Sequence, residues 1–189
     1  MASEASEVIL SMEDLREVAR FAAESAQEAL PIFESVHPGD SRPRDAIAAA
    51  WTFARGGKRG KTLRDTAWAA QKAAQDANTA AAGSAARAAM SAASAAYLHP
   101  LGDPHQVKHI LGAAAYAARA AELIAGDDRA VGSGRIELAR RNASPTVVDV
   151  LKRYPKAPPG GGRVGELLRD LDDALRGRSE GPDVPGGNP

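Results

Sequence analysis

Apolar residues recur at helical spacing along almost the whole chain, and no segment shows the alternation of apolar and polar residues that is typical of a strand. The first helix is expected after Ser11, which forms a capping-box pattern with Asp14. Its apolar face includes Leu15 and Phe33, and Pro31 is expected to kink it near its end. The pattern therefore predicts an all-α protein that opens with a long amphipathic helix.

Capping residues, prolines and glycines divide the rest of the chain into further helices. Pro43 suits a first helical position, and Gly56 and Gly57 end the helix that it starts. Asp103 and Pro104 mark a later start, as an acidic N-cap followed by a proline at the first helical position. The expected helices span about residues 41–55, 62–76, 79–98, 103–125, 134–142, 145–154 and 164–176.

The middle of the chain is rich in alanine. Between Ala46 and Ala121 more than a third of the residues are alanine, and between Ala77 and Gly102 the only charged residue is Arg87. Alanine is the strongest helix former, and a helix that is uncharged on every face must be covered by other helices or by a partner. We therefore expect the fourth and fifth helices to form a tightly packed, Ala-rich central hairpin.

Length and composition favour one cytoplasmic domain. The 189 residues hold 24 acidic and 24 basic side chains and no cysteine, which excludes disulfides and thiolate-bound metals. The N-terminus lacks the pattern of a secretion signal, and no uncharged apolar run is long enough to span a bilayer. We expect one domain of antiparallel helical hairpins over residues 11–176, between a flexible N-terminus (1–10) and a disordered, Gly- and Pro-rich tail (177–189).

A basic turn between the second and third expected helices resembles a phosphate-binding P-loop but departs from its motif. The first glycine of a P-loop would fall at Arg55, and the turn follows a helix rather than a strand. Its cations lie beside the unpaired N–H groups of a helix start, where they would suit an anion or an acidic partner surface. The patch is too short and too poor in aromatic residues to indicate nucleic-acid binding. The basic turn comprises Arg55, Lys58, Arg59, Lys61 and Arg64.

Three histidines lie around the start of the fifth expected helix. His105 and His109 are four residues apart and share a helix face, and His99 lies just before the helix. Two imidazoles at this spacing bind zinc when a third protein ligand is near, so the three histidines are a candidate metal site. Capping and solvation near the helix start are the alternative explanation for the same residues.

The face that carries two of these histidines continues along the fifth helix. Polar residues and a glycine are locally unfavourable in an alanine-rich helix, which makes them candidates for a ligand groove or a partner surface. The alternative is a solvated face on which the glycine allows close helix packing. Trp51 and Trp68 would suit the wall of a pocket, although their helical spacing favours the core. The stripe comprises His105, His109, Gly112, Tyr116 and Arg119.

Four segments of the chain resemble a known protein family, namely Arg42–Ile47, Tyr97–Leu101, Gln106–Glu122 and Leu151–Pro155. They are similar to the actinobacterial "putative immunity protein" family, over roughly residues 14–176, and the family name implies the binding and neutralising of a toxin. Members of the family are often labelled as SbcC-type exonucleases, but this chain lacks the P-loop and the long coiled-coil arms of such enzymes. One departure from the family is Gln71, where the third helix usually carries a histidine.

Three hypotheses about function follow. The first is an immunity or self-protection protein that binds a cognate toxin or antibacterial product without catalysis. The second is a helical protein that sequesters a small apolar or aromatic molecule, and the third is a metal-dependent enzyme built on the histidine cluster. No nucleophile motif or cofactor fingerprint is present in the sequence, so no cofactor is expected. Nucleic acid and membranes are not expected partners, and a homo-oligomer is left open.

Overall fold

The computed structural model describes residues 7–177, which form eight α-helices and one short 3-10 helix, with no β-strand in this range. The predicted all-α single domain is confirmed. Most of the predicted flexible N-terminus and nearly all of the predicted disordered tail lie outside the described residues. The helices are α1 (Met12–Glu34), α2 (Arg42–Ala54), α3 (Lys61–Asp76), α4 (Ala80–Ala95), α5 (Val107–Ile124, preceded by the 3-10 helix Pro104–Gln106), α6 (Arg129–Asn142), α7 (Pro145–Lys152) and α8 (Gly162–Arg176).

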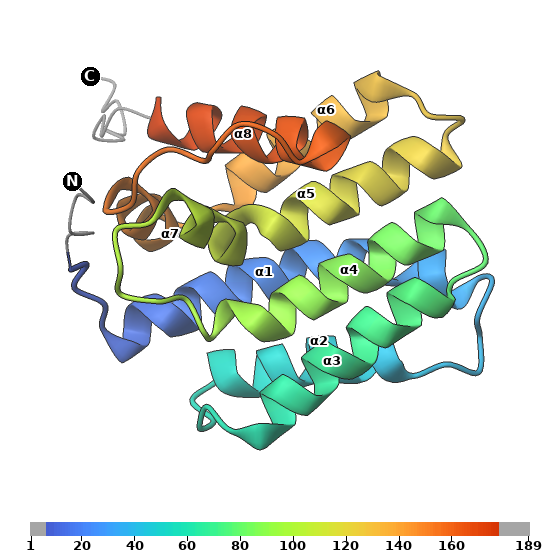
Figure 1. Cartoon of the computed structure of the whole chain (residues 1–189), viewed down its shortest axis with the longest axis horizontal. Helices are drawn as coiled ribbons and strands as arrows, with labels where there is room; N and C mark the ends of the chain where they lie inside the picture. Colours follow the sequence, from blue (N-terminus) through green and yellow to red (C-terminus); the bar gives the residue numbers. More distant parts are fainter. Residues whose placement is uncertain (1–6, 178–189) are drawn as a thin grey trace, which may run out of the picture.

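Helix α4 lies in the middle of the molecule. It packs against α1, α2, α3 and α5, and α1 also packs against α5 (Figure 1). The α2–α3 pair covers one side of this centre, while α6 and α8 cover the far side of α5. The expected central hairpin of α4 and α5 is therefore present, and α1 completes the core with it.

Alanine allows this close packing because its small side chain lets the backbones of neighbouring helices approach each other closely. Twelve residues of α4 are buried, and all of them are alanine, serine or glycine. Larger core side chains such as Phe33, Phe53 and Leu111 lie on the surrounding helices. Within residues 7–177 no helix combines the length and the hydropathy that crossing a membrane would need.

The capping box of α1 also ties the N-terminus to the end of the fold. The Ser11 hydroxyl accepts from the Asp14 N–H at 3.0 Å, and the Asp14 carboxylate accepts from the Ser11 N–H at 2.9 Å. Arg153, just after α7, donates to the same carboxylate at 2.7 Å. Val8, inside the segment expected to be flexible, is buried and donates to the Pro100 carbonyl at 3.0 Å.

Helix α6 begins five residues earlier than the sequence pattern predicts. The Asp128 side chain caps it by accepting from the Ala130 N–H at 2.9 Å. Gly132 and Gly134 lower the helix propensity of the first turns, and this hides the start in the sequence. The structure explains Gly132, because a Cβ there would lie 2.0 Å from a carboxylate oxygen of Glu122 on α5. Glycine is needed where the two helices approach this closely.

Candidate binding groove

One stripe of α4 is left uncovered by the other helices. The partly exposed residues of its central and last turns are Arg87, Met90 and Ser94, spaced three and four apart, and Tyr97 continues the row just after the helix. This spacing places them on one helix face. The stripe forms the floor of a surface groove between α3, α4, α5 and α8, which follow one another from bottom to top in Figure 1.

The groove consists of two adjoining hollows that share Met90, Ser94 and Tyr116. The first, here called the tryptophan hollow, has a volume of 460 Å³, and the second, the histidine hollow, has a volume of 480 Å³. Both values fall in the range of small-molecule sites. The remaining lining residues of the tryptophan hollow are Arg64, Ala67, Trp68, Gln71, Arg87 and Tyr97, and those of the histidine hollow are Ser91, Lys108, His109, Gly112, Gly161, Val164, Gly165 and Leu168.

The groove is basic, although the chain has no net charge. Its lining includes Arg64, Arg87 and Lys108 but no aspartate or glutamate. Among residues 7–177, neither arginine has a hydrogen bond or an ion pair with another residue. Because no carboxylate neutralises these cations, the groove is suited to a negatively charged ligand.

Aromatic side chains stand beside these cations. The Trp68 side chain on α3 is 74% exposed, and Tyr116 on α5 is half-buried where the two hollows meet. Tyr97 is fixed by a hydrogen bond from its hydroxyl to the Gly60 carbonyl at 2.8 Å. The buried side-chain oxygen of Gln71 has no hydrogen-bond partner in the described part of the chain. An exposed tryptophan and an unpaired buried acceptor are both unfavourable in an unliganded protein.

His109 lies in the histidine hollow and is linked to α4. Burial lowers the pKa of its imidazole below 6.5, and electrostatic interactions with Lys108 and His99 lower it further, while a hydrogen bond with the Ser94 backbone acts in the opposite direction. The ring is therefore held toward its neutral form inside the groove.

The predicted stripe on α5 is divided among three environments. His109, Gly112 and Tyr116 line the groove. His105 lines a neighbouring hollow of 220 Å³ against the 158–161 loop, which shares Lys108 and Leu168 with the histidine hollow. Gly112 is buried, and a Cβ added there would meet Ser91 Oγ at 3.5 Å, an ordinary contact, so close packing does not require glycine at this position.

Arg119, the last residue of the predicted stripe, contacts other residues of the chain rather than the groove. It donates to the Glu122 carboxylate at 2.8 Å and pairs with Asp127 in the turn before α6. Glu122 is fully buried, and Arg163 on α8 pairs with it at 2.5 Å. Arg119 and Arg163 together neutralise a charge that would otherwise be buried without a partner.

Most cations of the basic turn contact other residues of the protein. Arg59 donates to the Ala96 carbonyl at 3.1 Å and lies over the Tyr97 ring, and Lys61 pairs with Asp65 at 2.7 Å. Arg55 lies over the Trp51 ring, 4.9 Å from its centroid. Of the five predicted residues, which also include Lys58, Arg64 alone lines the groove. The turn joins two helices, as expected, and does not follow a strand.

Trp51 and Trp68, both predicted as pocket residues, lie in different places. Trp68 borders the groove, whereas the Trp51 indole on α2 donates to the Gln27 side chain at 2.9 Å and takes no part in the groove lining.

The predicted histidine site is not assembled in the described part of the chain. In the range 7–177, no group of three His, Cys, Asp or Glu side chains is placed to hold a metal ion. His99, His105 and His109 are therefore not placed as a ligand set; His105 lines the hollow against the 158–161 loop, whereas His109 lines the histidine hollow.

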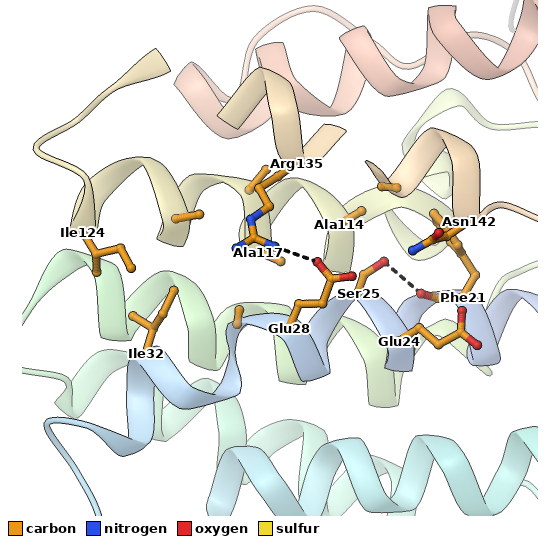
Figure 2. A pocket seen from close by; sticks show the side chains of 14 residues that line it. Phe21, Glu24, Ser25, Glu28, Ile32, Ala114, Ala117, Ile124, Arg135 and Asn142 are labelled. Carbon is orange, nitrogen blue, oxygen red and sulfur yellow. Dashed lines mark hydrogen bonds and ion pairs between the residues drawn. The ribbon is translucent and has the colours of Figure 1, made fainter. Parts of the chain in front are cut away.

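A second pocket lies between α1, α5 and α6 (Figure 2). Its volume is 100 Å³, below the range of small-molecule sites. Arg135 pairs with Glu28 across it at 3.4 Å, and Ser25 donates to the Phe21 carbonyl at 2.9 Å. Burial raises the pKa of Glu24 at its edge. Most of its polar groups thus have partners, and we regard it as a gap between packed helices.

Several groove residues were not candidates in the sequence. Arg87 was noticed as the only charge in its segment, but nothing in one sequence shows which helix face is left uncovered. Met90, Ser94 and Leu168 carry no functional signal, and they line the groove only because four helices meet there.

Comparison with known proteins gives one match. A family model described as Imm-5 like putative immunity protein matches residues 9–143. This range contains α1 to α6, and therefore every groove residue except those of α8 and the loop before it. No curated protein and no solved structure matches the chain.

Proposed function

Because the chain belongs to the Imm-5 like putative immunity protein family, we propose that it protects its cell by binding a toxin or another antibacterial product without catalysis. The observation that supports a binding role is the groove between α3, α4, α5 and α8. Its arginines lack partners within residues 7–177 and its tryptophan is exposed, so a bound partner would satisfy both.

The sequestering of a small molecule is the second candidate. It is favoured by the concave shape of the tryptophan hollow, whose 460 Å³ would admit a small organic ligand. An antibacterial product that is itself a small molecule would unite the two candidates, because sequestering it would be the means of protection.

Deletion of the gene from the producing strain tests this proposal. The deletion strain should be inhibited when it is grown beside its parent, and the wild-type gene should restore growth. Trp68→Ala and Arg87→Gln should fail to restore it, since both remove groove contacts, and Trp68 is too exposed for its loss to unfold the protein.

Trp51→Phe is the matched control, because Trp51 lies outside the groove. It should restore growth as well as the wild type does. A deletion strain that grows normally beside its parent would contradict the immunity role. Full protection by both groove variants would contradict the assignment of the site.

A further inference from the structure

The position of Arg87 suits the binding of an anion. Arg87 is the only charged side chain between Ala77 and Gly102, and it stands on an alanine-rich helix at the floor of the tryptophan hollow. Many arginines among residues 7–177 are paired at short range, as Arg42 is with Asp40 at 2.6 Å and Arg163 is with Glu122 at 2.5 Å. A half-buried guanidinium without such a partner loses hydration that an anionic ligand would replace.

A second cation lies in the same hollow. Arg64 on α3 also lacks a hydrogen bond or ion pair within residues 7–177, and no acidic side chain lines the hollow. Two guanidinium groups in one concave site suit a carboxylate, sulfonate or phosphate, because each presents several N–H donors to the oxygens of such a group.

The rest of the hollow is suited to a flat apolar body. Trp68 is 74% exposed at the edge, and Met90 and Tyr116 line the side toward α5. Aromatic rings bind flat ligands by offset stacking, and burying the indole would remove a large apolar surface from water. The hollow is concave and has a volume of 460 Å³, which fits a small molecule better than the broad, flat surface of a protein partner.

We propose that the tryptophan hollow binds a small organic anion, with its charged group on Arg64 and Arg87 and its flat apolar body against Trp68 and Tyr116. Only one part of this proposal rests on the proposed function, namely the choice of the groove as the binding site. The proposal names the class of the ligand, which the family does not.

A pair of dyes with the same ring system tests both halves of the proposal. 8-Anilino-1-naphthalenesulfonate carries the anion, and N-phenyl-1-naphthylamine is its neutral counterpart. The folded wild-type protein should bind the sulfonate saturably at one site, by fluorescence titration and by calorimetry. The double variant Arg64→Gln/Arg87→Gln should bind it at least tenfold more weakly but bind the neutral dye as before. Trp68→Ala should weaken the binding of both dyes.

Arg141→Gln is the matched control, because Arg141 is an exposed arginine on α6, away from the groove. It should leave both affinities unchanged, and circular dichroism should show that every variant is folded. The proposal is overturned if the wild-type protein shows no saturable sulfonate binding, or if the double arginine variant binds the sulfonate as tightly as the wild type.

The dye titrations test the anion site, and the growth assay tests the immunity role, so either can be contradicted without the other. Sulfonate binding that depends on both arginines, together with full protection by Arg87→Gln, would support the anion site and separate it from immunity. Protection that depends on the groove without sulfonate binding would overturn the anion site and leave the immunity role in place.

Discussion

Glu122 is a buried residue at which three helices, α5, α6 and α8, meet. Its carboxylate lies on α5, accepts hydrogen bonds from Arg119 and Arg163, and fills the space above Gly132 on α6. Burying a carboxylate is unfavourable unless it is paired, so both arginines and the glycine are needed around it. In the sequence, Arg119 resembled an interface residue. The sequence does not show that Glu122, its partner in the structure, is buried.

The first prediction uses two glycines of α6. Gly132→Ala should lower the free energy of unfolding by about 3 kcal/mol or more, because its Cβ would displace the Glu122 carboxylate from its ion pairs. Gly134→Ala is the control, since no atom lies within 4 Å of its Cβ, and it should raise stability by up to about 1 kcal/mol. Urea denaturation measures both. Equal effects of the two changes would show that Glu122 does not occupy this space.

His109 gives the protein a pH dependence that can be measured. Burial, Lys108 and His99 hold its pKa below the ordinary value of 6.5. The unfolded chain therefore takes up a proton first as the pH falls, so this contribution to stability is complete above pH 6.5 and is lost as the pH falls through the folded-state pKa.

Between pH 7.5 and pH 5.5, the wild-type protein should thus lose more stability than His109→Gln does. His105→Gln, which changes an exposed histidine of the same helix region, should behave like the wild type. Urea denaturation at the two pH values provides the comparison. A wild-type protein and a His109→Gln variant with equal losses would rule out the buried histidine as the cause.

Within single elements, capping residues located the starts of several helices, although the start of α6 was missed despite its Asp128 cap. Ser11, Thr79 and Ser144 each accept from a backbone N–H at the start of the expected helix. The pattern placed two other helix boundaries less well. Helix α4 ends at Ala95, three residues before the expected end, and the first turn before α5 is a 3-10 helix.

The burial of α4 can be tested with one substitution and its control. Ala89 is fully buried, so Ala89→Asp should lower the free energy of unfolding by about 3 kcal/mol or more, because the carboxylate would lose its hydration without gaining a partner. Ala80→Asp places the same side chain at the exposed first position of α4, where the helix dipole favours it, and should have little effect. Comparable melting temperatures for the two variants would contradict the central place of α4.

At the scale of the whole molecule, the groove depends on how four helices meet. The sequence named five of its lining residues as candidates, namely Trp68, His109, Gly112 and Tyr116 for a ligand or partner and Arg64 for the basic turn. It also placed His105, Arg119 and Trp51 among the candidates, because helical spacing shows which residues share a face but not which neighbouring element covers that face. A site assembled from α3, α4, α5 and α8 lies beyond what one periodic pattern can show.

The proposed role of the groove is to bind the product against which the protein protects. The chain has two tryptophans, and the structure places Trp68 in the groove and Trp51 outside it. Trp51→Phe therefore leaves a fluorescent probe in the groove, and Trp68→Phe leaves one elsewhere. Both proteins would be titrated with the fraction of the parent strain's culture medium that inhibits the deletion strain. We predict a saturable shift in emission from Trp68 and no change from Trp51. A saturable change from Trp51 alone would contradict the account.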